Sequence, residues 1–146
     1  MSMLDHVGFA VADYGRSKAF YEKALAPLGY ELLMEFSGAA AGFGKDDGGR
    51  PSFFIEAHGE PVHGRLHIAF GAESRERVDA FHAAALEAGG TDNGAPGLRW
   101  YHDDYYGGYV LDPDGNNVEA VCHKPASELR AGRRRSLAST QRPAPR

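Results

Sequence analysis

The stretch Asp5-His6-Val7-Gly8-Phe9-Ala10-Val11, residues 5–11, decides the fold because residues 66–70, Leu66-His67-Ile68-Ala69-Phe70, repeat it. An offset of 61 residues places His6 on His67 and Phe9 on Phe70. Self-similarity at a fixed offset indicates a duplicated structural unit. The same offset continues downstream and aligns Ala19 with Ala80, Phe20 with Phe81, Ala24 with Ala85, Leu25 with Leu86 and Gly29 with Gly90.

Each half of the chain has the pattern of a strand, a helix and then three strands. In the first half, strands are predicted at 4–11, 30–36, 39–44 and 52–57, with a helix over 17–26 that ends at Gly29. In the second half, strands are predicted at 65–70, 109–111 and 117–122, with a helix over 74–88 capped by Ser74. Asp112-Pro113-Asp114-Gly115 is a turn signal between the last two strands, and the strand register of residues 91–100 stays open. The pattern predicts an α+β fold of two βαβββ modules.

Strand alternation sorts the side chains of these strands between two faces. Val7, Phe9 and Val11 share the face expected to pack on the helix, and Cys122 faces the same layer as a small buried residue. The opposite face receives one His or Glu from each of four strands: His6, Glu56, His67 and Glu119.

Two neutral imidazoles and one or two carboxylates suit a borderline divalent metal such as Zn, Ni, Co, Mn or Fe(II). The sequence therefore predicts a site for one divalent ion, although each of these side chains taken singly also fits a structural or solvent-facing role.

The quoted stretches, together with Asp112-Pro113-Asp114-Gly115-Asn116-Asn117-Val118-Glu119, resemble the vicinal oxygen chelate superfamily. This superfamily includes glyoxalase I, the bleomycin- and fosfomycin-resistance proteins and the extradiol dioxygenases. The resemblance covers about residues 3–124 and implies a U-shaped mixed sheet around a metal-binding cup. It implies one domain over residues 1–124, made of two repeats at about 1–60 and 63–124. It also implies that His6, Glu56, His67 and Glu119 are the metal ligands and that Glu56 or Glu119 acts in catalysis.

The sequence departs from glyoxalase I at two positions that hold glutathione in that family. Ala10 and Glu60 stand where an Arg and an Asn are common. Residues 99–109 resemble a stretch of uncharacterised glyoxalase-like members of the superfamily. This stretch offers a cation, phenol groups and aromatic faces for a small oxygenated or aromatic substrate, or for packing at a loop or dimer interface. The substrate-binding candidates are Arg99, Tyr101, His102 and Tyr105.

Four functions follow from these observations. The leading one is a metal-dependent lyase or isomerase of the glyoxalase type, in which the ion stabilises an enediolate and Glu56, the more mobile carboxylate, is the base. The others are an Fe(II) extradiol-type dioxygenase, a thiol transferase of the fosfomycin-resistance type, and a metal-free drug-binding protein of the bleomycin-resistance type.

Composition bounds the class of protein. Hydrophobic residues make up 42% of the 146 residues and charged residues 25%, as in a globular domain. No apolar run is long enough to cross a bilayer and the start has no signal-peptide pattern, so a cytoplasmic protein is expected. The single cysteine excludes an intrachain disulfide.

Charge divides the chain unevenly. Residues 124–146 hold seven Lys or Arg against one Glu, while the rest is acidic, so nucleic-acid binding by the fold is not expected. Residues 125–146 are predicted to be a disordered basic tail, either a solvated segment or a contact for an anionic partner. Half-open sheets expose apolar edges, and a homodimer is therefore expected.

Overall fold

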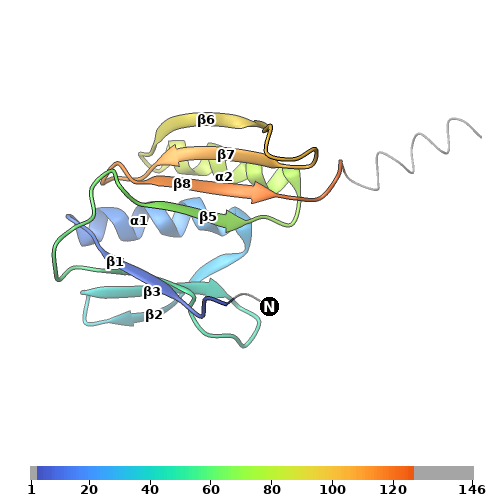
Figure 1. Cartoon of the computed structure of the whole chain (residues 1–146). Helices are drawn as coiled ribbons and strands as arrows, with labels where there is room; N and C mark the ends of the chain where they lie inside the picture. Colours follow the sequence, from blue (N-terminus) through green and yellow to red (C-terminus); the bar gives the residue numbers. More distant parts are fainter. Residues whose placement is uncertain (1–2, 127–146) are drawn as a thin grey trace, which may run out of the picture.

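The computed structural model describes residues 3–126 and contains two modules, each with the order strand, helix and three strands (Figure 1). The first module comprises β1 (Val7–Ala10), α1 (Tyr14–Leu25) with the short helical turn Ala26–Leu28, β2 (Tyr30–Phe36), β3 (Ala40–Lys45) and β4 (Phe53–Glu56). The second comprises β5 (His67–Gly71), α2 (Arg75–Glu87), β6 (Thr91–Leu98), β7 (Tyr106–Leu111) and β8 (Asn117–Cys122). The duplicated pattern and the α+β class are confirmed.

The strands form two four-stranded mixed sheets of equivalent topology. Their orders are β1-β4-β3-β2 and β5-β8-β7-β6, with the first pair of each sheet parallel and the other pairs antiparallel. The family resemblance implies a U-shaped mixed sheet made by the two modules, and the described strands make one four-stranded sheet per module, each ending at an edge strand, β1 or β5. A cavity of about 350 Å³ lies between these two strands.

Side-chain caps set the starts of both helices. Ser74 Oγ accepts the N–H of Arg77 at 3.2 Å, which confirms the predicted start of α2. The first helix begins three residues earlier than predicted because Asp13 Oδ1 accepts the N–H of Arg16 at 3.1 Å. The carboxylate cap satisfies an N–H that would otherwise be left without a partner in the first turn.

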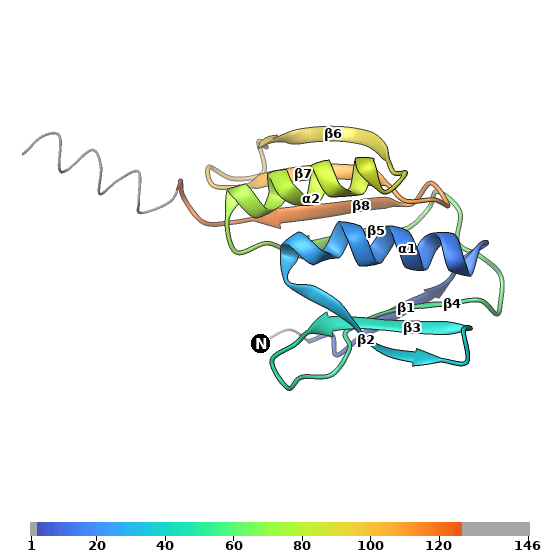
Figure 2. The same cartoon turned by 180° about the vertical axis from the view of Figure 1, so that it is seen from behind.

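Both helices pack on the same side of the strands and against each other (Figure 2). One core lies between the helices and the two sheets, and it contains Phe9, Val11 and the predicted buried Cys122. Val7 departs from the prediction: it is 37% exposed because it lies at the edge strand β1 and lines the cavity between the sheets.

The turn between β7 and β8 joins the two modules. Asp112 Oδ2 accepts a 2.6 Å hydrogen bond from the Tyr21 hydroxyl of α1. Asn116 is fully buried; its Nδ2 donates to the carbonyl of Val62, and its Oδ1 accepts from the N–H of Leu66. The predicted turn is therefore confirmed, and its polar side chains also tie the second module to α1 and to the segment between the modules.

Residues 3–126 contain no helix with the length and apolar character that crossing a bilayer requires. The predicted basic tail lies, from residue 127 onward, outside the described residues.

Candidate functional site

Strands β5 and β8 bring His67 and Glu119 together. The strands pair in parallel with His67 opposite Asn117 and Ala69 opposite Glu119. The two side chains share one face, and His67 Nε2 lies 3.1 Å from Glu119 Oε2. Glu119 is 1% exposed, whereas about half of the His67 side chain is open to solvent. A buried carboxylate thus meets an accessible imidazole.

Hydrogen bonding fixes the orientation of the His67 ring. Nδ1 lies 3.1 Å from the carbonyl oxygen of Asn117, which only accepts, so Nδ1 carries the proton in the neutral ring. Nε2 then presents its lone pair toward Glu119 Oε2, and two acceptors face each other. Either a proton or a cation between them resolves this repulsion.

The spacing of these two atoms fits a shared metal ion. Ligand atoms that bind one ion at about 2.1 Å, with angles from 90° to tetrahedral, lie about 3.0–3.4 Å apart. The observed 3.1 Å lies in this range. A metal-binding histidine usually donates one ring N–H to a backbone or carboxylate oxygen and presents the other nitrogen to the metal, as His67 does here.

Two tyrosines of the β6–β7 region lie beside Glu119. The Tyr105 hydroxyl donates to Oε1 at 2.5 Å. Burial, followed by this hydrogen bond, raises the pKa of Tyr105 well above its usual value. Burial and then the charge of Glu119 also raise the pKa of Tyr109, whose ring stacks on His67 at 6.4 Å between centroids. Both phenols therefore stay protonated at neutral pH.

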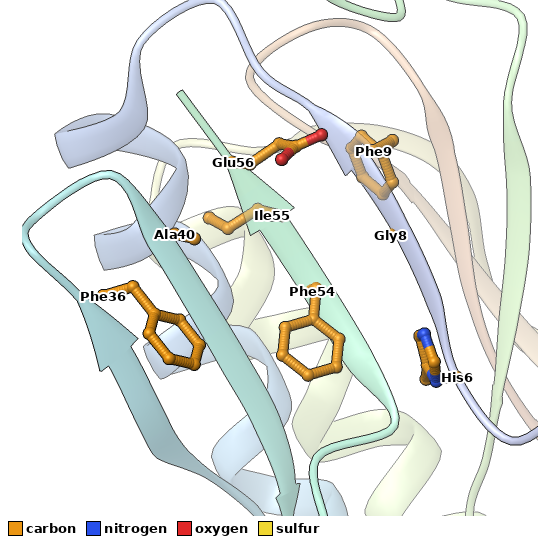
Figure 3. A pocket seen from close by; sticks show the side chains of 8 residues that line it. All are labelled: His6, Gly8, Phe9, Phe36, Ala40, Phe54, Ile55 and Glu56. Carbon is orange, nitrogen blue, oxygen red and sulfur yellow. The ribbon is translucent and has the colours of Figure 1, made fainter. Parts of the chain in front are cut away.

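His6 and Glu56 line a cavity of about 370 Å³ on the first module (Figure 3). Phe54 lies between them, and its ring meets the His6 ring edge-on at 5.6 Å. His6 Nδ1 lies 2.7 Å from Asp5 Oδ1, so its Nε2 is presented in the same manner as that of His67. The Glu56 carboxylate makes no hydrogen bond or ion pair with any residue of 3–126.

The two candidate His–Glu pairs differ because the parallel strands β1–β4 and β5–β8 place their His and Glu at different positions. Residue Glu119 lies opposite Ala69, the repeat equivalent of Gly8, but Gly8 lies opposite Phe54. Glu56 is two residues further along, opposite Ala10. It is thus four residues, about 13 Å, beyond the position across from His6. Within one chain the structure joins His67 with Glu119 and leaves His6 apart from Glu56.

The predicted substrate-binding residues form an aromatic cluster around Tyr105. The Tyr101 and His102 rings each meet the Tyr105 ring edge-on, at 4.8 and 5.5 Å. Arg99 contacts this cluster through its backbone, whose N–H donates to the carbonyl of Tyr105 at 2.8 Å. Its guanidinium donates to the carbonyls of Ala95 and Leu98 and lies over the ring of Tyr109.

Two residues of this region were missed from sequence. His123 is not among the candidates singled out from the sequence, yet its Nδ1 lies 2.9 Å from His102 Nε2 and its ring meets that of Tyr105. Tyr109 was not singled out although it pairs directly with Glu119. Counting outward from the Asp112–Asn116 turn predicts this cross-strand pair, because the turn fixes the hairpin register.

Among residues 3–126, no three His, Cys, Asp or Glu side chains come together in a group that could hold a metal ion. Of the four candidate ligands, His67 and Glu119 lie in contact on the second module, and His6 and Glu56 lie apart on the first.

A family model described as the Glyoxalase/Bleomycin resistance protein/Dioxygenase superfamily matches residues 3–120. The chain belongs to this superfamily. Comparison with curated proteins gave no match.

Solved structures of superfamily relatives share the fold. A glyoxalase/bleomycin resistance protein from Albidiferax ferrireducens T118 is 35% identical, covers 85% of this chain and 100% of its own, and has a TM-score of 0.71. A glyoxalase/bleomycin resistance protein/dioxygenase family enzyme from Burkholderia phytofirmans PsJN is 20% identical over 84% of this chain and 100% of its own, with a TM-score of 0.65. Lactoylglutathione lyase from Agrobacterium tumefaciens is 19% identical over 84% of this chain and 94% of its own, with a TM-score of 0.61.

Proposed function

We propose that the chain is a metal-dependent lyase or isomerase of the glyoxalase type that acts on a small substrate with vicinal oxygens. The observation that carries the proposal is the His67–Glu119 pair, in which His67 Nε2 lies 3.1 Å from the buried Glu119 Oε2. His67 and Glu119 of one copy hold a divalent ion together with His6 of a second copy, and Glu56 of that second copy lies further along its strand, beyond reach of the same ion. When bound, the ion supplies Lewis-acid chemistry that stabilises negative charge developing on substrate oxygens.

The two carboxylates have different roles in this proposal. Glu119 is buried and both of its oxygens have partners, so it is the fixed ligand. Glu56 is exposed and no residue of 3–126 holds its carboxylate, so it is free to remove a proton from the substrate carbon. A general base needs this freedom because it must reach the reacting proton and then release it.

The cavity on the first module supports a substrate with an apolar or aromatic group. Phe36, Phe54 and Ala40 line it between His6 at one end and Glu56 at the other (Figure 3). In the proposal, the apolar group occupies the space beside Phe54 while the oxygen atoms are directed to the polar ends.

Metal content and turnover test the proposal together. Protein purified without chelator or affinity nickel is expected to bind about one divalent ion per site, and His67→Ala to lose it while His123→Ala keeps it. Glu56→Gln is expected to keep much of its metal yet lose about 10²-fold or more in turnover of a 2-oxoaldehyde adduct, thiol-linked or free. Unchanged metal content in His67→Ala contradicts the metal site, and full activity in Glu56→Gln contradicts the assignment of the base.

A second candidate is an Fe(II)-dependent dioxygenase. The register difference favours it, because Glu56 lies two residues further along its strand than the equivalent of Glu119. Two histidines and one carboxylate, His6, His67 and Glu119, then make up the ligand set typical of non-haem Fe(II) oxygenases. This candidate would be selected if the Fe(II)-loaded protein takes up oxygen with a catechol and does not turn over a 2-oxoaldehyde adduct.

A further inference from the structure

Glu119 differs from the other candidate ligands in having a protein partner on each oxygen. Oε2 faces Nε2 of His67 at 3.1 Å, and Oε1 accepts the Tyr105 hydroxyl at 2.5 Å. A carboxylate held in this way cannot rotate to exchange its two oxygens without breaking a short hydrogen bond to a charged group, which is about twice as strong as a neutral one.

Local backbone geometry makes room for this contact. Gly107 lies on β7 next to the carboxylate, and a Cβ there would lie 2.9 Å from Glu119 Oε1 and 3.2 Å from the Tyr105 ring. Such a Cβ would occupy the space in which the phenol and the carboxylate meet. The contact between Tyr105 and Glu119 therefore depends on the absence of a side chain at Gly107.

The Tyr105 ring is itself fixed by aromatic neighbours. Tyr101 meets it edge-on at 4.8 Å, and His102 and His123 at 5.5 and 5.2 Å. A hydroxyl on a ring packed on several sides keeps its direction, as a group that orients a metal-binding carboxylate must.

We propose that Tyr105 is a positioning residue that acts through Glu119. By donating to Oε1 it leaves Oε2 as the one oxygen directed at Nε2 of His67, so that Glu119 would offer a metal a single oxygen. This inference rests on the proposed metal site. A carboxylate that offers one oxygen would leave the substrate a position that a carboxylate bound through both oxygens would fill.

Titration of apo protein with Co²⁺ and Zn²⁺ tests the inference without any substrate. Tyr105→Phe removes only the donor, and Tyr101→Phe is the matched control because it removes an exposed phenol from the same cluster. Tyr105→Phe is expected to weaken metal binding about 10–100-fold, the usual effect of losing a second-shell partner. Tyr101→Phe is expected to bind as the parent does.

The visible spectrum of the Co²⁺-loaded proteins gives a readout that general destabilisation does not change. Without the Tyr105 donor, Oε1 becomes available as a second contact, so the coordination number is expected to rise and the absorption to weaken in Tyr105→Phe but not in Tyr101→Phe. Gly107→Ala, which adds the Cβ beside Oε1, is expected to alter the spectrum as well. Circular dichroism of each variant establishes that the fold is retained.

The outcomes separate the two proposals. A parent protein that binds metal, together with a Tyr105→Phe protein of equal affinity and identical spectrum, overturns the role of Tyr105 and leaves the metal site standing. A parent protein that binds no divalent ion overturns the metal site and this inference with it. If Tyr105→Phe fails to fold, an unchanged Co²⁺ spectrum in folded Gly107→Ala overturns the inference, and a changed one supports it.

Discussion

At Gly90, just before β6, there is no room for a side chain. A Cβ there would lie 2.9 Å from both Phe20 Cε2 and the carbonyl oxygen of Ala85, and closer still to Val110. Gly90→Ala is therefore expected to lower the free energy of unfolding by about 1–3 kcal/mol, as in other overpacked cores. Urea unfolding followed by circular dichroism measures this change.

Gly71→Ala is the matched control, because nothing lies within 4 Å of the added Cβ at the end of β5. Its free energy of unfolding is expected to stay within about 0.5 kcal/mol of the parent value. Equal losses in both variants would contradict the steric explanation at Gly90, because Gly→Ala lowers the entropy of the unfolded chain and by that effect stabilises the fold.

Alternation along strands predicts which residues share a face but not which of them meet. It placed His67 and Glu119 on one side, and the parallel register of β5 and β8 brings them to 3.1 Å. The same rule put His6 and Glu56 on one side, yet they are four strand positions apart. The contact between Tyr105 and Glu119 depends on the path of the β6–β7 loop, which residue types alone do not fix.

Among the connecting elements, the Asp112–Asn116 turn offers a test of how the modules are joined. Asn116→Ala leaves the carbonyl of Val62 and the N–H of Leu66 without their buried partner. A loss of about 1–3 kcal/mol in the free energy of unfolding is expected. Asn93→Ala, which removes an exposed hydrogen bond to Asn117, is the control and is expected to cost less. An equal cost in the two variants would contradict the joining role.

The start of β6 is joined to α2 by a pH-sensitive contact. The Gly94 N–H, and then His82, lower the pKa of Asp92 below its ordinary value. A carboxyl with a lowered pKa stabilises the fold above its unfolded pKa of about 3.9, and this contribution is lost as the pH falls through the lower folded value. Asp92→Asn is therefore expected to lower Tm at pH 7. The difference from the parent should shrink as the pH falls below about 4, and a constant difference would contradict the assignment.

Helices and turns were the most predictable elements. The start of α2 follows from one residue, Ser74, whose side chain caps the helix. The Asp112–Gly115 turn follows from its proline at the second position and its glycine at the fourth. The sequence pattern predicts a start of α1 at Ser17, three residues after the observed one at Tyr14. Asp13 caps it instead, and Ser17 lies inside the helix, buried.

For the whole molecule, the separation of the two candidate pairs predicts a homodimer with shared sites. Exposed apolar side chains occur on both modules, including Phe36 on β2 and Leu98 on β6. Light scattering is expected to show a dimer at micromolar concentration, and a monomer would contradict the prediction.

Mixing two variants that each lack one candidate histidine tests whether the metal sites are shared between copies. His6→Ala and His67→Ala each remove one half of a site, and unfolding and refolding them together forms mixed dimers. If the sites are shared, one site of each mixed dimer keeps both histidines, so about a quarter of the parent metal content is expected. Sites built within single chains would recover none.

The fold class followed from the repeat, because two copies of one pattern require two copies of one module. The division into two sheets did not follow. Whether β1 and β5 pair depends on the spacing between the modules, which is set by helix packing and the polar side chains of the turn.

The two-residue difference in register between the modules has a consequence for the history of the chain. A duplicated segment starts with two identical halves, and here one module brings its His and Glu into contact while the other separates them along an apolar cavity. The two halves are therefore no longer interchangeable. Under the proposed function, a tandem of two copies of residues 63–124 would carry two His–Glu pairs and no equivalent of Glu56, so it would hold an ion but would lack the base that turnover requires.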